Sequence, residues 1–269
     1  MSVFWLVAMD TGGEPEEGFQ APGVESFDLP PLFEGAPAWL DKYLLWAAVS
    51  VILILIFWLV MAGKNRMVPT KGQFIGETAY FFVRNSIARD NLGHDFRKFL
   101  PWLIALFSFI LINNLWGIFP FTLMPTTAHA GWAYGLAIMV WVVYNAVGIA
   151  KHGFGGYLKL ATLPAGVPVF MWWLIIPLEF ISNIIVRPIT LSLRLFANMF
   201  AGHLLLILFA LGGEYLIVHG SLLVKPVGIL AWVLFILVAF LELLVQFLQA
   251  YVFTLLNAMY ISGALAEEH

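Results

Sequence analysis

Two stretches in the last third of the chain place polar side chains inside otherwise apolar sequence. The first contains Arg194, whose guanidinium group keeps its proton at any workable pH and therefore carries a permanent charge. Such a charge costs about 2.5 to 3.5 kcal/mol at the centre of a membrane helix, so it must be compensated or used. At 100° per residue, five other polar side chains fall within about 60° of Arg194 and form one stripe with it: Glu179, Asn183, Arg187, Thr190 and Asn198.

The second stretch carries another polar stripe near the end of the chain. At the same helical spacing its members share one face: Glu242, Gln246, Gln249, Phe253 and Tyr260. Two polar stripes on apolar helices indicate surfaces that face protein or water, while the remaining faces suit lipid.

Glu242 and His203 are the side chains best suited to pass protons. A buried carboxyl group binds a proton more readily than one in water, and an imidazole titrates near neutral pH. His203 lies about 180° from Arg194 on an ideal helix, which argues against direct contact between the two. It could therefore face a separate water path or be a lone structural histidine.

Composition indicates an integral membrane protein, which we expect to be all-α. Hydrophobic residues make up 62% of the chain and charged residues 11%, with a mean hydropathy of +0.92, whereas soluble domains carry about 25% charged residues. The absence of cysteine excludes disulfides, iron–sulfur clusters and thiolate metal sites. No basic block indicates nucleic acid binding, and no phosphate-binding loop of the form G-x-x-x-x-G-K-[ST] is present. We expect no cofactor, no metal and no nucleotide chemistry in this chain.

Hydropathy predicts about five spanning or steeply tilted helices and one interfacial helix. The interfacial helix is expected over residues 73–99, which mix aromatic and charged side chains. The last two apolar segments are longer than a helix needs to be to cross a bilayer core of about 30 Å. They must therefore tilt, lie nearly in the membrane plane or break. In the first of the two, a break would fall at Pro177 or Pro188. We expect the first of them to end at the glycines that follow, leaving Glu214 and His219 in a loop. The predicted spans are residues 43–63, 100–120, 132–150, 167–211 and 226–265.

Charge segregation predicts the topology. Residues 1–42 hold eight carboxylates and, up to Asp41, no lysine or arginine, so we expect an acidic extracytoplasmic tail before a membrane domain at 43–269. The loops at 64–71 and 151–159 are basic, which marks the cytoplasmic side. The N-terminus should lie outside and the C-terminus inside, without a cleaved signal peptide.

The first polar run resembles the signature of subunit a of the rotary ATP synthases. It reads Arg-Pro-Ile-Thr-Leu-Ser-Leu-Arg-Leu-Phe-Ala-Asn-Met-Phe-Ala-Gly-His over residues 187–203. Residues 242–254 and 259–269 are similar to the family as well, so the resemblance covers the last third of the chain. It implies a non-catalytic, ion-translocating stator subunit of the ATP synthase complex. The implied partners are a rotor ring of c subunits, the b subunits of the peripheral stalk and the lipid bilayer. The implied location is a membrane, most simply a bacterial inner membrane.

The resemblance also implies site residues. Arg194 faces the carboxylates of the rotor, a polar partner at Gln249 sits across from it, and two half-channels carry ions from either side. The outer half-channel is implied to hold Asn198, His203, Glu242 and Gln249, with Gln246 on the same face and Asn114 lining the path. The inner half-channel is implied to be flanked by Glu179, Asn183 and Thr190. Familiar relatives often place the acid and the imidazole on the opposite helices, and they often carry an acid near Gly117, which this chain lacks.

Several alternatives remain open at this stage. Arg194 could be only a structural partner of Glu242, Glu179 or backbone carbonyl oxygens, Glu179 could pair with Arg187, and Gln249 or Asn114 could be interhelical glue. The chain could be a secondary transporter or proton channel, although neither inverted repeats nor a midplane substrate site is visible. If the chain were a purely structural anchor, Arg194 would be dispensable. Haem or copper binding by the histidines is disfavoured, because no two of them lie at helical ligand spacing inside one span. H⁺ is the expected ion, while Na⁺ stays open because the family's ion ligands lie mainly on the rotor.

Overall fold

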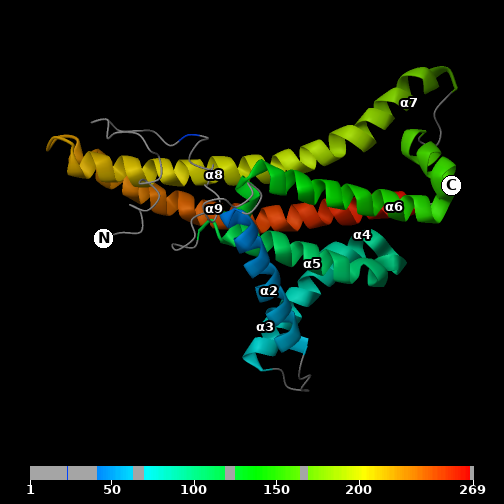
Figure 1. Ribbon diagram of the computed structural model, residues 1–269, viewed down its shortest axis with the longest axis horizontal. Helices are drawn as coiled ribbons and strands as arrows, with labels where there is room; N and C mark the ends of the chain where they lie inside the picture. Colours follow the sequence, from blue (N-terminus) through cyan, green and yellow to red (C-terminus); the bar gives the residue numbers. More distant parts are fainter. Residues whose placement is uncertain (1–22, 24–40, 63–69, 119–124, 164–168, 267–269) are drawn as a thin grey trace.

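The computed structural model describes residues 23, 41–62, 70–118, 125–163 and 169–266 (Figure 1). All regular elements within these ranges are helical, and five segments are long and apolar enough to cross a bilayer. The predicted all-α class is therefore confirmed. The acidic tail predicted at residues 1–42 lies almost entirely outside the described residues.

The first three predicted spans form helices with shifted ends. Helix α2 covers Lys42–Ala62, α5 covers Phe96–Leu115 and α6 covers Ala130–Thr162. Helix α6 continues past the predicted end at residue 150 because the chain kinks at Gly153 and resumes a helical path. Gly153 has φ 73°, a left-handed value that a residue without Cβ adopts at little cost.

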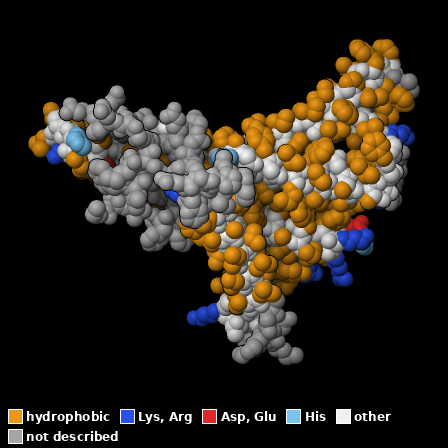
Figure 2. All heavy atoms as spheres, viewed as in Figure 1, with side chains coloured by type: hydrophobic (Ala, Val, Ile, Leu, Met, Phe, Trp, Pro, Cys, Tyr) orange, Lys and Arg blue, Asp and Glu red, His pale blue; other side chains and the backbone are white. Residues whose placement is uncertain are grey.

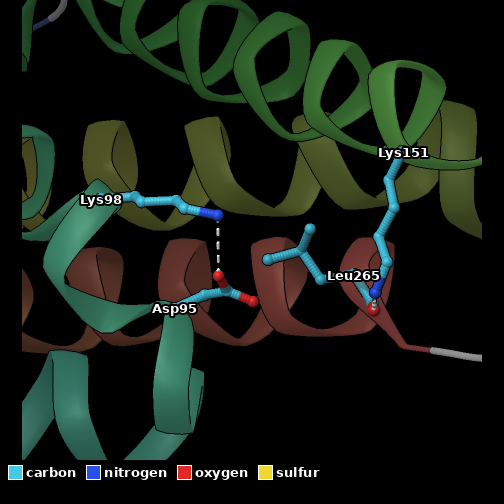
Figure 3. Close-up of polar contacts among 4 residues, drawn as sticks. All are labelled: Asp95, Lys98, Lys151 and Leu265. Atoms are coloured by element: carbon cyan, nitrogen blue, oxygen red, sulfur yellow. Dashed lines mark hydrogen bonds and ion pairs between the residues drawn. The ribbon is translucent and has the colours of Figure 1, made fainter.

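The segment predicted as an interfacial helix is helical and folds back on α5. It comprises α3 (Lys71–Val83), the π-helix η2 (Arg84–Arg89), α4 (Asp90–Leu92) and the 3₁₀ turn η3 (Gly93–Asp95). The reversal occurs at Gly93, where φ is +54°. Next to it Lys98 pairs with Asp95 at 3.0 Å, an exposed ion pair of little energetic weight (Figure 3). The position of this segment at a membrane surface stays a prediction.

The fourth predicted span is longer than expected. The turn η5 (Val169–Met171) leads into α7 (Trp172–Phe180), the π-helix η6 (Ile181–Val186) and α8 (Arg187–Val218). The path does not break at either proline. Pro188 has no N–H to donate to the carbonyl group four residues earlier, and the wider π turn lies directly before it.

The predicted end of this span near residues 212–214 is wrong. Gly213 is buried inside α8, and a Cβ atom there would lie 2.5 Å from Trp232 Cδ1 and 3.3 Å from the Gly228 carbonyl oxygen. The glycine therefore permits close helix packing and does not terminate the helix. As a consequence Glu214 lies within α8, and only His219 follows its end.

Helix α9 (Lys225–Leu265) confirms the fifth predicted segment and organises the molecule. It lies beside α8 along the long axis, with α6 next to both and α5 packed against α9 (Figure 1). The main buried cluster joins these four helices to the α3–α4 segment and includes Leu103, Val140, Leu195 and Phe253. Hydrophobic side chains dominate the described surface in Figure 2, as expected for helices that face lipid.

Candidate functional site

The buried face of α9 carries three predicted site residues. Glu242, Gln246 and Gln249 expose at most 4% of their surface, although the opposite face of α9 is exposed and apolar. Gln246 Nε2 donates a hydrogen bond to Glu242 Oε1 at 3.5 Å. We call these residues, with His203, the Glu242 cluster.

Gly202 of α8 makes room for the Glu242 carboxyl group. A Cβ atom at Gly202 would lie 3.2 Å from both Glu242 Cδ and Oε1. The next residue, His203, is 3% exposed and lies on the buried face of α8. The two predicted proton-exchanging groups therefore come from facing segments of the α8–α9 pair, and His203 is not on the surface that carries Arg194.

Asn198 and Gln249 meet between α8 and α9. Asn198 Nδ2 donates to Gln249 Oε1 at 3.0 Å, so the structure brings together two residues predicted for one path. Gln249 Nε2 is buried and has no hydrogen-bond partner among the described residues. The Gln249 amide thus retains a donor that a water molecule could use.

Asn114 of α5 joins the Glu242 cluster through the backbone. Its Nδ2 donates to the Gln246 carbonyl oxygen at 3.4 Å, and its Oδ1 accepts from Thr127 Oγ1 at 2.7 Å. Asn113, the neighbouring amide, instead binds Thr126 and Ser50 at 2.7 and 3.2 Å. Both asparagines are fully buried and bind other segments of the chain, which fits either interpretation of Asn114, as interhelical glue or as a residue that lines the path.

A second polar cluster lies where α6 meets α7 and η6; we call it the Asn183 cluster. Asn183 Nδ2 donates to Glu179 Oε2 at 3.1 Å and to the carbonyl oxygen of Ala161. Tyr144 OH, from α6, donates to the Asn183 carbonyl oxygen at 3.1 Å. The structure therefore brings together Glu179 and Asn183, two residues predicted for the inner half-channel.

Arg187 completes the Asn183 cluster through an aromatic ring. Its Cζ lies 5.0 Å from the centroid of the Tyr260 ring, a cation–π contact, and Tyr260 lies 5.5 Å from the ring of Tyr144. Glu179 forms no ion pair with Arg187 in the described part of the chain, so the structure does not show that predicted alternative.

Thr190 and Arg194 lie on the exposed side of α8. Thr190 Oγ1 donates to the carbonyl oxygens of Val186 and Arg187 at 2.9 and 3.1 Å, so its hydroxyl is bound to its own helix. Arg194 is exposed, and among the residues that the structure describes it forms no ion pair with any carboxylate. The alternative of a structural pair with Glu242 or Glu179 is therefore not observed. Arg194 presents a cation on the surface of the chain.

The sequence interpretation missed three buried polar side chains in or beside these clusters. Thr127 holds Asn114, Tyr144 holds Asn183, and Asn257 is a fully buried amide on the same face of α9 as Gln249. The helical spacing from Gln249 to Asn257 is a signal that could have identified the last of them. Within the described ranges, no group of three or more His, Asp or Glu side chains could hold a metal ion.

Known proteins similar to this chain agree with the resemblance in the sequence. Residues 44–262 match the family described as "ATP synthase A chain". "ATP synthase subunit a" of Nocardioides sp. is 56% identical over 94% of this chain and 95% of its own length. The proteins of the same name from Pseudarthrobacter chlorophenolicus and Streptomyces lividans are 45% and 36% identical, over 98% and 94% of this chain and 100% and 90% of their own lengths. The chain therefore belongs to the ATP synthase subunit a family, whose members are the proton-translocating subunits of the enzyme's membrane sector.

Proposed function

We propose that this chain provides two half-channels that carry protons to and from the carboxylates of a rotor ring. The observation that carries the proposal is the exposed position of Arg194, with buried proton-exchanging and amide side chains behind it. A permanent cation that forms no ion pair with the described residues of its own chain is available to a carboxylate on a partner. Beside such a carboxylate it favours the ionised form, and it repels a cation in transit.

The Glu242 cluster is the proposed outer half-channel. Glu242, Gln246 and Gln249 follow one buried face, and Asn114 and Asn198 bind two members of this row. The row ends at the Asn198–Gln249 hydrogen bond, one helical turn from Arg194. A proton that reaches Gln249 would therefore be close to a rotor carboxylate docked near Arg194.

The Asn183 cluster is the proposed inner half-channel. Glu179 supplies a carboxyl group and Asn183 orients it through the 3.1 Å hydrogen bond. Thr190 is not supported as a lining residue by its contacts, because its hydroxyl group is bound to its own backbone. We retain Glu179 and Asn183 in this path and treat Thr190 as a helix-internal contact.

The proposed orientation follows from the basic loops. Lys151 belongs to a basic segment predicted to be cytoplasmic, and its Nζ donates to the carbonyl oxygen of Leu265 at 2.6 Å, close to the end of α9 (Figure 3). This contact supports a common side for the 151–159 segment and the C-terminus. We propose that this side is cytoplasmic and that the N-terminus lies outside in a bacterial inner membrane.

The proposed partners are the c-subunit ring, at the surface around Arg194, and the b subunits of the peripheral stalk. In this proposal the chain is not catalytic by itself, and nucleotide chemistry resides in other subunits. Purification of the tagged chain from its native membrane tests the assignment. The proposal expects a ring-forming small subunit and nucleotide-hydrolysing subunits in stoichiometric amounts. Recovery of the chain alone, from membranes in which such a complex is intact, would contradict it.

A further inference from the structure

The buried face of α9 carries a row of polar atoms that lack hydrogen-bond partners in the described part of the chain. They are Glu242 Oε2, Gln246 Oε1, Gln249 Nε2, and both Nδ2 and Oδ1 of Asn257. A buried polar group without a protein partner indicates bound water, since leaving it unsatisfied costs about 1 to 3 kcal/mol. The row therefore offers hydrogen-bonding positions that buried water could occupy.

The row has one gap. Gln249 and Asn257 are eight residues apart, or about 12 Å along the helix axis, and Phe253 lies midway between them on the same face. The Phe253 side chain is fully buried. An aromatic ring offers no hydrogen bond to a water chain, so the row is apolar at this point.

The helix register places Phe253 level with Arg194. Helices α8 and α9 are antiparallel, and Asn198, four residues after Arg194, binds Gln249, four residues before Phe253. Arg187, seven residues before Arg194, stacks on Tyr260, seven residues after Phe253. The two contacts bracket one level at which Arg194 points to the surface and Phe253 to the interior.

A second apolar side chain lies at this level. Leu195, next to Arg194, is fully buried and belongs to the same buried cluster as Phe253. Consecutive residues of α8 thus serve two surfaces at one depth. Arg194 faces outward, while Leu195 joins Phe253 inside.

We propose that Phe253 and Leu195 form an apolar seal inside the subunit, which separates the water-binding row at Glu242–Gln249 from the buried amide of Asn257. The inference rests on the proposed function, because the row at Glu242–Gln249 is the proposed outer half-channel. On the other side of the seal, Asn257 lies one helical turn from Tyr260, whose ring is 5.5 Å from the Tyr144 ring of the Asn183 cluster. Arg194 then closes the direct route on the surface that faces the rotor, and the seal closes the route through the protein interior. A proton can pass only when a rotor carboxylate carries it around Arg194. Apolar constrictions block conduction by excluding water, which is the physical basis of the seal.

The test uses the complete ATP synthase assembled with a ring whose carboxylates are changed to amides, so that no proton can travel on the rotor. Passive proton influx into vesicles is measured after a pH jump, with subunit content checked. The seal predicts that Phe253→Ser raises influx about tenfold or more over the parental chain, a drop in the barrier of about 1.4 kcal/mol. Phe253→Leu, which keeps an apolar side chain at the position, should restore the low influx.

Phe107→Ser is the matched control, because Phe107 is buried in the same cluster but packs against Phe82 and Phe247 near α3 and α5. It should remain as tight as the parent. If Phe253→Ser does not assemble, Leu195→Ser opens the same level from α8 and carries the same expectation. Parental influx in the assembled variant, or equal influx in Phe107→Ser, would overturn the seal. Neither result bears on Arg194, whose own variants test the proposed function with an unaltered ring.

Discussion

Asn198 of α8 and Gln249 of α9 are joined by a hydrogen bond of 3.0 Å, the polar contact between the two long helices nearest to Arg194. Its position ties the end of the buried polar row to the surface that carries the cation. Gln249 is 3% exposed and Asn198 is exposed, so the pair connects the interior with the surface.

This contact predicts coupling between the two amides. Asn198→Leu and Gln249→Leu should each lower proton-driven ATP synthesis, and the double variant should lose less than the product of the single losses. In double-mutant cycles, residues in direct contact show interaction energies of about 0.5 to 3 kcal/mol. Synthesis rates of the parent, both single variants and the double variant measure the coupling. Strictly multiplicative losses would show that the two side chains act independently.

Gly202 predicts a steric effect on Glu242. In Gly202→Ala the new Cβ atom would meet the Glu242 carboxyl group at 3.2 Å, which displaces the carboxyl group by a few tenths of an ångström. We expect slower ATP-driven proton pumping without loss of assembly. Gly135→Ala in α6 is the matched control, because its added Cβ would meet nothing within 4 Å beyond the nearby backbone of its own helix. Equal pumping by the two variants would contradict a requirement for this geometry.

Glu242 and His203 are predicted to act on one path. Glu242→Ala and His203→Ala should each slow proton flux, because each removes a group that exchanges protons. A double variant no slower than the slower single variant would support a shared path, since residues that act as a unit are not additive. Parental flux in both single variants would remove the pair from the path.

The position of the termini is open to a direct test. Cysteines introduced at Glu16 and Glu268 should react with an impermeant thiol reagent from opposite sides of sealed vesicles. The chain has no cysteine of its own, so any labelling reports on the introduced position. The expected reaction is at Glu16 from outside and at Glu268 from the cytoplasmic side. Labelling of both positions from one side would contradict an odd number of crossings.

Much of the fold was predictable because apolar length and helical period are local properties. The bounds of α9 followed from Pro226 and from the long, mainly apolar segment after it. The end of α8 was not predictable, since Gly213 reads as a helix terminator until its packing against Trp232 and Gly228 is known. In the same way, Gly153 kinks α6 without ending it.

The sites were predictable to the extent that they follow one helix face. Helical spacing grouped Glu242, Gln246 and Gln249, and the structure buries all three together. Partners from other helices could not be derived this way: Tyr144 reaches Asn183, and Tyr260 covers Arg187 in place of the Glu179 carboxylate. Such contacts depend on the register between helices, which a single sequence does not display.

The role of Arg194 is tested most directly by proton-driven ATP synthesis in vesicles that contain assembled Arg194→Gln enzyme. The exposed guanidinium group makes no ion pair with the described residues of its own chain, so its loss should leave insertion and assembly intact. Lysine at this position should rescue poorly, because its ammonium group lacks the planar fork and can lose its proton when buried. We predict that the Arg194→Gln enzyme, at normal subunit content, makes no ATP. Near-parental synthesis at that content would contradict the proposed mechanism.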